Sequence, residues 1–388
     1  MPTLQLPTAD RRMESYRTRE PRSWEVKPQG NFDRIALAAA HVVADPLVEI
    51  NPWIESAIDW DATIAYRRHL WSCGLGVAEA MDTAQRGMGL DWERALKLIE
   101  MSVDASRDVA GAVVFSGAGT DHLALDPSIG VDDVIGAYEH QIAAIEKVGG
   151  RIIVMASRAL AAIARSPDDY VKVYGRILRQ VREPVIIHWL GDMFDPSLRG
   201  YWGSSELPVA TEVCLSILSE HSDFVDGIKV SLLDKDHEIS MRRRLPRGVR
   251  MYTGDDFNYP ELIAGDSEGY SDALLGIFDA IAPAASSALD AHARGDIGLF
   301  HEILAPTVPL ARHLFGEPTR FYKTGVVFLA YLNGHQSHFT MVGGQQSARS
   351  LVHLAQAFRL ADAAGLLRDP DVAAARMRNV LRVHGVEG

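Results

Sequence analysis

The chain has 388 residues, of which 47% are hydrophobic and 23% are charged, which is an ordinary composition for a globular protein. Its formal net charge of −12 argues against a surface that binds nucleic acid or an anionic membrane, although a pocket within it can still be locally positive. The two cysteines do not form a disulfide framework, no apolar run is long enough to span a bilayer, and no signal peptide is recognisable. We therefore expect a cytoplasmic protein whose partners include neither nucleic acid nor a membrane.

The predicted elements begin after a polar stretch. Residues 1–32 contain several prolines and arginines and are expected to form an N-terminal extension that packs on the main body or trails from it. Beyond it, short and nearly continuous apolar runs alternate with amphipathic stretches, and such runs are typical of parallel strands buried on both faces. The runs lie at 34–41, 76–81, 112–116, 151–155, 184–189, 225–231, 249–253 and 270–277. Helices are predicted between them over 61–72, 91–106, 131–147, 167–181 and 207–220.

Strand–helix units repeated about every 30 residues predict an α/β fold, the (β/α)8 or TIM barrel, for which about 250 residues are typical. The barrel would occupy residues 33–282. An open doubly wound sheet is the alternative, but no G-x-G-x-x-G follows a predicted strand. After residue 283 the strand pattern stops, and helical stretches at 284–316, 321–333, 346–367 and 371–385 predict a C-terminal helical domain over 283–388.

The first catalytic candidate is Lys229, which stands alone in the apolar strand 225–231. Lysine is rarely buried without a partner or a function, and burial lowers its pKa toward the neutral amine. A neutral lysine amine attacks carbonyl carbons and forms a Schiff base. The structural alternative is a lysine that is ion-paired with Asp255 or Glu79.

Other polar side chains follow the strand ends, where barrel enzymes have their active sites. His188 lies on the strand before the lysine strand and is predicted to relay protons, unless it is a hydrogen-bonded core histidine. Gly254 permits close backbone approach. Asp255 and Asp256 are predicted to hold hydroxyl groups, to contact the lysine or to bind a metal, with helix capping as the alternative for Asp256.

Arg158 is predicted either to bind a carboxylate or phosphate or to begin a helix at the surface. A divalent metal is a competing hypothesis, with His41, His122 and Asp82 as its ligands. Since the candidate ligands lack a tight spacing such as H-x-H or H-E-x-x-H, we expect no metal and no other cofactor.

Several of these segments resemble the dihydrodipicolinate synthase/N-acetylneuraminate lyase family, which consists of class I aldolase-like barrels that form Schiff bases. The similarity rests on Gly227-Ile228-Lys229, on Thr253-Gly254-Asp255-Asp256, on the proline-led strand at 184–188, and on residues 275–283 and 321–367. It implies a Schiff base on Lys229 and a homo-oligomer, either a dimer or a tetramer.

The sequence also departs from that family. His188 stands where the family has a tyrosine, and Ala156-Ser157-Arg158 stands near the place of a second tyrosine. Ala80-Met81-Asp82-Thr83-Ala84 replaces the family's loop that binds the carboxylate of a keto acid. The Schiff-base lysine is thus kept without the pyruvate-specific contacts, which favours a carbonyl substrate rich in hydroxyl groups.

The sequence therefore predicts a lyase of carbohydrate metabolism, either an aldolase or a hydro-lyase, that acts on a small keto-acid or keto-sugar carbonyl compound. Alternatives are a metal-assisted lyase or isomerase on the same barrel and a non-catalytic homologue that binds a sugar or keto acid. The predicted catalytic residues are Lys229 and His188. The predicted substrate-binding residues are Asp82, Thr83, Ser157, Arg158, Gly254, Asp255 and Asp256.

Overall fold

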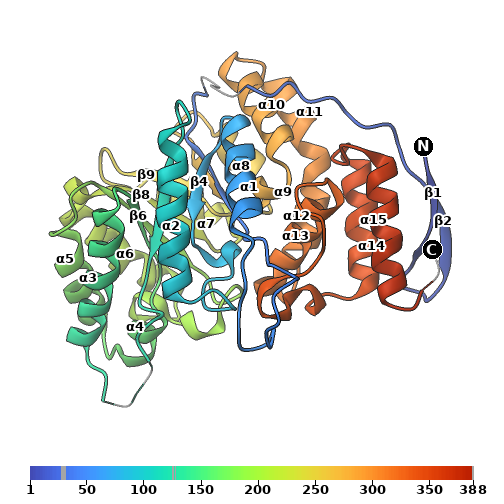
Figure 1. Ribbon diagram of the computed structural model, residues 1–388. Coiled ribbons are helices and arrows are strands. Elements are labelled where there is room, and N and C mark those ends of the chain that lie inside the picture. Colours follow the sequence, from blue (N-terminus) through green and yellow to red (C-terminus); the bar gives the residue numbers. More distant parts are fainter. Residues whose placement is uncertain (28–31, 125, 127, 387–388) are drawn as a thin grey trace.

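A closed barrel of parallel strands forms the centre of the molecule (Figure 1). The computed structural model describes residues 1–27, 32–124, 126 and 128–386. The strands follow one another around the barrel in chain order, and the last pairs with the first through Ala273 and Ala36. They are β3 (Ala36–Ala39), β4 (Gly76–Glu79), β5 (Val114–Ala118), β6 (Arg151–Val154), β7 (Val185–Leu190), β8 (Val225–Ser231), β9 (Arg250–Thr253) and β10 (Asp272–Leu275). The predicted TIM barrel is confirmed.

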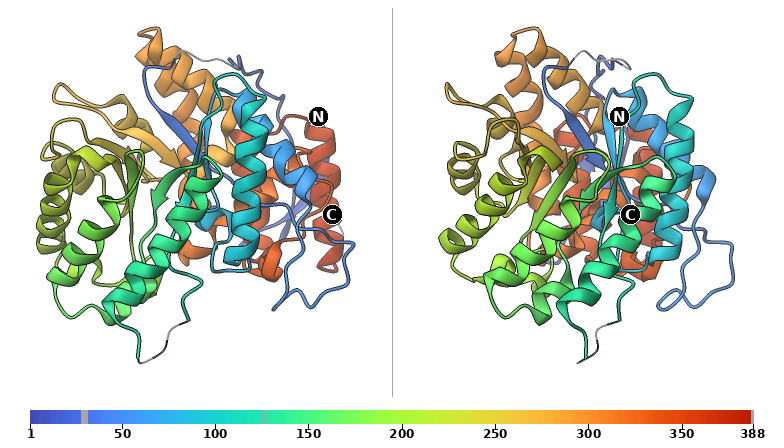
Figure 2. Two further views of the ribbon diagram at one scale, coloured as in Figure 1. Left: turned by 60° about the vertical axis from the view of Figure 1, so that its left-hand side comes forward. Right: turned by 90° about the vertical axis from the view of Figure 1, so that its left-hand side faces the viewer.

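Helices surround these strands, as the two views of Figure 2 show. They are α1 (Trp60–Ser72), α2 (Trp92–Arg107), α3 (Val131–Lys147), α4 (Arg158–Ile163), α5 (Pro167–Leu178), α6 (Leu207–Glu220), α7 (Lys235–Arg242), α8 (Tyr259–Ala264), α9 (Ile277–Ala280) and α10 (Ala282–Ala293). Acidic N-caps set several of their starts. The side chains of Asp59 and Asp91 each accept a hydrogen bond from the backbone N–H three residues later, which satisfies a donor that the helix leaves free.

The helices of the C-terminal region lie against one side of the barrel (Figure 1). The stretch predicted as helical over 284–316 is divided into α10, α11 (Ile297–Leu304) and α12 (Val308–Leu314). The first break occurs because Gly295 adopts a positive φ of 82° and Asp296 then caps α11. The chain continues with α13 (Tyr322–Leu332), α14 (Leu351–Ala363) and α15 (Pro370–Val383).

The N-terminal extension contains a hairpin that the sequence did not predict, formed by β1 (Thr3–Pro7) and β2 (Met13–Arg17). The hairpin packs on the last two helices. Arg359 of α14 donates hydrogen bonds to the backbone carbonyls of Leu6 and Pro7 at 3.2 and 3.1 Å, and the Tyr16 hydroxyl donates to Asp362 at 2.7 Å. Residues 18–27 then lead back toward the barrel. Positions 28–31 of the predicted extension lie outside the described residues.

The core has two parts. Inside the barrel, side chains from the strands and the strand ends form one apolar cluster, which consists of Leu37, Ala39, Ala78, Met81, Phe115, Ile153, Ile186, Tyr252 and Leu274. A larger cluster lies between the strands and their outer helices and continues into the C-terminal helices. The division into a barrel and a separate helical domain at residue 283 therefore stays a prediction.

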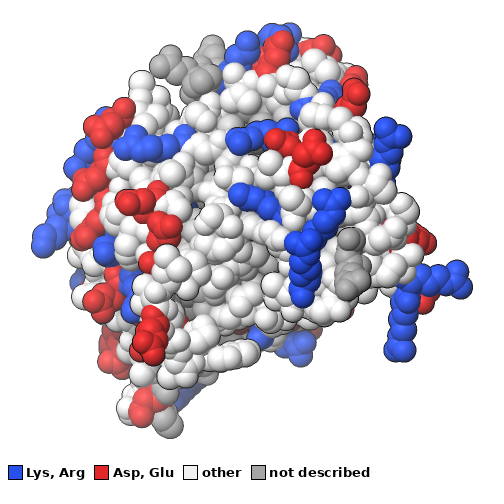
Figure 3. Space-filling view, turned by 45° about the vertical axis from the view of Figure 1, so that its right-hand side comes forward, with Lys and Arg blue, Asp and Glu red and all other residues white. Residues whose placement is uncertain are grey.

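The distribution of surface charge and the lengths of the helices indicate which kinds of partner the protein could contact. Figure 3 shows acidic and basic side chains interspersed along the left and upper edges of one face, whose centre is mainly uncharged. In the described part of the chain, no helix has the length and apolar character needed to cross a membrane.

Candidate active site

Lys229 lies in the middle of β8, level with His188 on β7 and Tyr252 on β9. It is only 5% exposed. Burial lowers the pKa of its amine, while the carboxylates of Asp82 and Asp256 oppose that shift. Within the described residues, no hydrogen bond or ion pair holds the amine, so it is buried near two acids without being bonded to either.

The two acids named as structural partners of the lysine are bonded elsewhere. Glu79 pairs with Arg67 at 2.8 Å. Asp255 accepts hydrogen bonds from the backbone N–H groups of Phe257 and Asn258 at 2.8 and 3.0 Å and from the Asn258 side chain at 2.8 Å. Asp255 therefore stabilises the turn that leads to α8.

The surroundings of the His188 imidazole favour its neutral form. Burial lowers its pKa well below the usual value, and the neighbouring Lys229 lowers it further, while Asp82 acts in the opposite direction. Its Nε2 atom lies 3.2 Å from the hydroxyl oxygen of Ser231. A neutral imidazole has one nitrogen free to accept a proton, which is what a proton relay beside an amine requires.

Gly254 lets β9 approach β8 directly above the lysine. Its N–H donates to the carbonyl of Val230 at 2.8 Å. A Cβ atom at this position would lie 2.1 Å from the Ser231 hydroxyl oxygen and 2.8 Å from Cε of Lys229. The close approach expected of this glycine is therefore necessary for both side chains.

Asp256 caps a helix, although not the one that follows it directly. Its carboxylate accepts a hydrogen bond at 2.7 Å from the N–H of Ile277, the first residue of α9. Burial raises the pKa of Asp256, and the Ile277 N–H and Lys229 oppose that rise. Asp256 and Lys229 are thus near enough for each to influence the pKa of the other.

Asp82 and Thr83 follow β4 in a short 3-10 helix, η1 (Asp82–Ala84), and meet a tyrosine from α13. The Tyr322 hydroxyl donates to Asp82 at 2.7 Å and lies 2.6 Å from the Thr83 hydroxyl, which is left to act as the donor in that pair. Burial raises the pKa of Asp82, but Lys323, Lys229 and His188 outweigh it and lower the pKa overall. Asp82 is an ionised acid among three basic groups.

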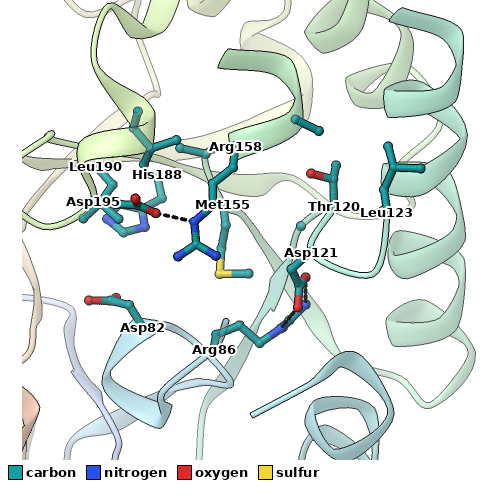
Figure 4. A pocket seen from close by; sticks show the side chains of 14 residues that line it. Asp82, Arg86, Thr120, Asp121, Leu123, Met155, Arg158, His188, Leu190 and Asp195 are labelled. Atoms are coloured by element: carbon teal, nitrogen blue, oxygen red, sulfur yellow. Dashed lines mark hydrogen bonds and ion pairs between the residues drawn. The ribbon is translucent and has the colours of Figure 1, made fainter. Parts of the chain in front are cut away.

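A cavity of about 220 Å³ opens beside these residues (Figure 4). Arg158 forms an ion pair with Asp195, and its guanidinium group points toward Asp82 across the cavity. On the opposite wall, Arg86 binds Asp121 through two hydrogen bonds of 2.6 and 2.8 Å. The cavity is lined by Asp82, Arg86, Gly119, Thr120, Asp121, Leu123, Met155, Ala156, Arg158, Ala159, His188, Leu190, Asp195 and Leu198.

The predicted site residues fall into two groups. Asp82, Arg158 and His188 line the cavity. The others are not part of its lining, and they are Lys229, Thr83, Ser157, Gly254, Asp255 and Asp256.

Ser157 is the clearest case of a residue that serves the backbone. It caps α4 by accepting a hydrogen bond from Leu160 N–H at 2.9 Å, and its hydroxyl also lies 2.6 Å from that of Thr120.

The structure does not bring the predicted metal ligands together. The His41 ring lies 2.9 Å from Asp279, while the His122 ring lies 2.8 Å from the Gln141 amide. Asp82 is bonded to Tyr322. Over residues 1–27, 32–124, 126 and 128–386, no three histidine, cysteine, aspartate or glutamate side chains are arranged to hold a metal ion.

The sequence interpretation missed Arg86, Asp195, Tyr322 and Lys323 as site residues. Lys323 is 2% exposed, and burial lowers its pKa to about 8, against the influence of Asp82. It carries the same signal that singled out Lys229, namely a lone lysine in a buried apolar run. Tyr322 and Lys323 come from a helix more than 200 residues after η1, and no local pattern predicts that the two segments meet.

Comparison with known proteins gives a family without an assigned activity. The family described as "Protein of unknown function (DUF993)" matches residues 4–386. No curated protein matches the sequence.

The solved structures that resemble the chain share its fold. Dihydrodipicolinate synthase from Thermotoga maritima has a TM-score of 0.62 at 15% identity, covering 86% of this chain and 99% of its own. The enzyme from Aquifex aeolicus has a TM-score of 0.60 at 14% identity, covering 91% and 98%. A prophage protein of the dihydrodipicolinic acid synthase family from E. coli K12, solved in complex with pyruvate, has a TM-score of 0.62 at 13% identity, covering 91% and 99%. At these identities the comparison confirms the resemblance at the level of the fold.

Proposed function

We propose that this chain, which belongs to the DUF993 family, is a lyase that forms a Schiff base through Lys229. The observation that carries the proposal is a buried lysine amine with no hydrogen-bond partner in the described residues, placed level with a neutral histidine. A structural lysine at this depth would be paired, because an unpaired buried charge is costly. An amine kept neutral by its surroundings is the form that attacks a carbonyl.

The neighbouring groups suit the proton transfers of this chemistry. Attack of the Lys229 amine on a carbonyl carbon gives a carbinolamine, which loses its hydroxyl group as water to form the imine. The hydroxyl group must gain a proton to leave as water, and the nitrogen of the attacking amine must lose one. We assign this exchange to His188, which has one free ring nitrogen, and to Asp256, whose raised pKa lets it carry a proton near neutrality.

The cavity indicates the kind of substrate. Its volume of about 220 Å³ suits a compound of a few carbon atoms. The wall combines the carboxylates of Asp82 and Asp195 with the guanidinium groups of Arg86 and Arg158. Such a wall offers acceptors and donors to several hydroxyl groups, so a small keto sugar fits it well. A short keto acid is the second member of the class, supported by the structural relative solved with pyruvate.

Borohydride trapping tests the proposal. The protein is incubated with pyruvate, dihydroxyacetone or a ketopentose, then reduced with sodium borohydride and mapped by peptide mass spectrometry. We expect one of these compounds to remain on Lys229 as a secondary amine, and Lys229→Arg to remove the adduct. Lys147→Arg, at an exposed lysine of α3, is the matched control and should leave the adduct in place.

Two results would count against the proposal. One is the absence of an adduct on Lys229 with every compound of the panel. The other is equal labelling of Lys229 and of exposed lysines, which would indicate unspecific modification. Stabilisation by a compound that leaves no adduct would favour the non-catalytic binding protein instead.

The expected homo-oligomer belongs to the same proposal, since it follows from the family resemblance. Light scattering on the purified chain measures it directly, with a dimer or tetramer as the expected mass. A monomer would contradict that part of the proposal without affecting the chemistry at Lys229.

A further inference from the structure

A second cavity, of about 480 Å³, lies outside the barrel and shares no residue with the first. Its walls come from α1, from α9 and the start of α10, from the end of α13 and the residues after it, from the loop between α14 and α15, and from residues 21–26 of the N-terminal extension. It is lined by Pro21, Arg22, Ser23, Trp24, Val26, Tyr66, His69, Asp279, Ala280, Pro283, Leu329, Ala330, Asn333, His335, Leu366 and Arg368. A volume of this size is within the range of small-molecule sites.

One part of the lining is apolar and aromatic. The indole of Trp24, the ring of Tyr66 and the side chains of Leu329 and Leu366 face this space. Flat aromatic walls of this kind favour a ligand with a planar apolar body.

Another part of the lining is cationic. The guanidinium group of Arg368 is exposed and forms no ion pair within the described part of the chain. Arg22 lies 4.7 Å from the centre of the Trp24 ring and 3.3 Å from Glu302. The lining carboxylate, Asp279, is bonded to the backbone N–H and the ring of His41. The uncompensated charge that faces the cavity is therefore positive.

Two histidines complete the polar lining. The rings of His69 and His335 lie 4.3 Å apart. Burial lowers the pKa of both, with Arg368 acting in the same direction, and brings that of His335 to about 3. Neither ring makes a hydrogen bond to the described residues, so each offers a donor and an acceptor beside the guanidinium group of Arg368.

We propose that this cavity is a binding site for a small organic acid with a planar apolar body. The body would lie between Trp24, Tyr66 and Leu366, and the carboxylate would accept hydrogen bonds from Arg368 and the two imidazoles. Charge-assisted bonds of this kind are stronger than neutral ones, and Arg binds carboxylates in a planar, two-point geometry. The site is independent of the chemistry proposed for Lys229.

Isothermal titration calorimetry with 2-naphthoate tests this site, and 2-naphthalenemethanol serves as the neutral control compound. We expect one 2-naphthoate to bind per chain and the alcohol to bind at least about tenfold more weakly. Arg368→Gln should weaken 2-naphthoate binding by about tenfold and leave the alcohol nearly unaffected. Arg247→Gln, at an exposed arginine that is not part of the lining, and Lys229→Ala should leave both affinities unchanged.

Filling the cavity is the second test. Ala330→Trp places an indole in the space and should abolish binding of both compounds. Because Ala330 is buried, a variant at the half-buried Ala280, Ala280→Phe, fills the same space from another element and decides the result if the first does not fold. The proposal is overturned if the native chain shows no saturable binding of 2-naphthoate, or if Arg368→Gln and Ala280→Phe leave that binding unchanged.

Discussion

Two clusters of buried charged groups lie in the same barrel, and they differ in how completely they are bonded. In the first, Arg67 binds both oxygens of Glu79 at 2.9 and 2.8 Å and donates to the carbonyl of His41. Glu79 also accepts from the Ser102 hydroxyl and from the N–H of Ala80. In the second, Lys229 has no such partner in the described residues, and His188 has one contact at 3.2 Å.

The difference separates a structural role from a chemical one. A buried ion pair whose oxygens and N–H groups are all bonded has no capacity left for a ligand, and it stabilises one arrangement of the chain. A buried amine without a partner is an energetic cost that the fold accepts, and such groups collect at functional sites. The first cluster holds α1 to β4, whereas the second leaves an amine and an imidazole free to react.

Replacing the basic residue of each cluster should give the largest difference in the free energy of unfolding. Arg67→Met leaves the Glu79 carboxylate buried and unpaired, and we expect the free energy of unfolding to fall by about 3–5 kcal/mol. Lys229→Met removes a buried amine that has no partner, so its effect should be below about 1 kcal/mol or stabilising. Urea unfolding followed by circular dichroism measures both. Equal losses in the two variants would show that Lys229 is as well paired as Arg67.

Glu238 is a buried acid bonded to neutral hydroxyl groups, and we expect it to have an effect of intermediate size on stability. Burial raises the pKa of Glu238 to about 8, while hydroxyl groups of Ser271 and Thr253 bond to it. Between about pH 4 and 8 the folded state then holds a proton that the unfolded state has lost, so stability falls as the pH rises, by at most about 1.4 kcal/mol per pH unit.

Glu238→Gln should flatten that slope, because the amide cannot ionise. Urea unfolding at several pH values between 4 and 8 measures it. Glu212→Gln, at an exposed glutamate of α6, is the control and should keep the slope of the native chain. An unchanged slope in Glu238→Gln would mean that Glu238 is ionised in the folded state.

The glycine above the lysine tests how tightly the second cluster is packed. In Gly254→Ala, the added methyl group would collide with Ser231 and with Lys229, and we expect a loss of about 1–3 kcal/mol together with weaker trapping at Lys229. Gly136→Ala in α3, where a Cβ meets nothing within 4 Å, should instead stabilise by about 0.5–1 kcal/mol. Thermal unfolding compares the two. A neutral Gly254→Ala would contradict the packing described here.

The smallest effect concerns the charge beside the lysine. Asp82 raises the pKa of Lys229, so Asp82→Asn should lower the pH midpoint of Lys229 acylation. Acetic anhydride labelling, mapped by mass spectrometry over a range of pH, measures the midpoint. Asp195→Asn removes an acid that acts on Lys323 and should leave the Lys229 midpoint in place. A shift in the opposite direction would exclude the electrostatic role given to Asp82.

The sequence predicted the parts of this molecule that depend on local patterns. Apolar runs placed the barrel strands, and the lone lysine in one of them indicated the amine beside His188. Tyr322 and Lys323 were not predicted as site residues because their place in the site depends on a contact between α13 and η1, which are distant in the chain. The N-terminal hairpin was not predicted because its strands are short and carry few buried side chains, such as those of Leu4 and Leu6. The surface on which it packs comes from α14 and α15, which are distant in the chain.

That hairpin has a consequence for the way the protein is made. Residues 3–17 are synthesised long before α14 and α15, the helices on which they pack. The barrel has its strands in chain order and can begin to assemble during translation, whereas the hairpin has no helical surface to bind until α14 and α15 have been synthesised. The second cavity, which is walled by residues 21–26 together with Leu366 and Arg368, is therefore complete only after the segment between α14 and α15 has been synthesised.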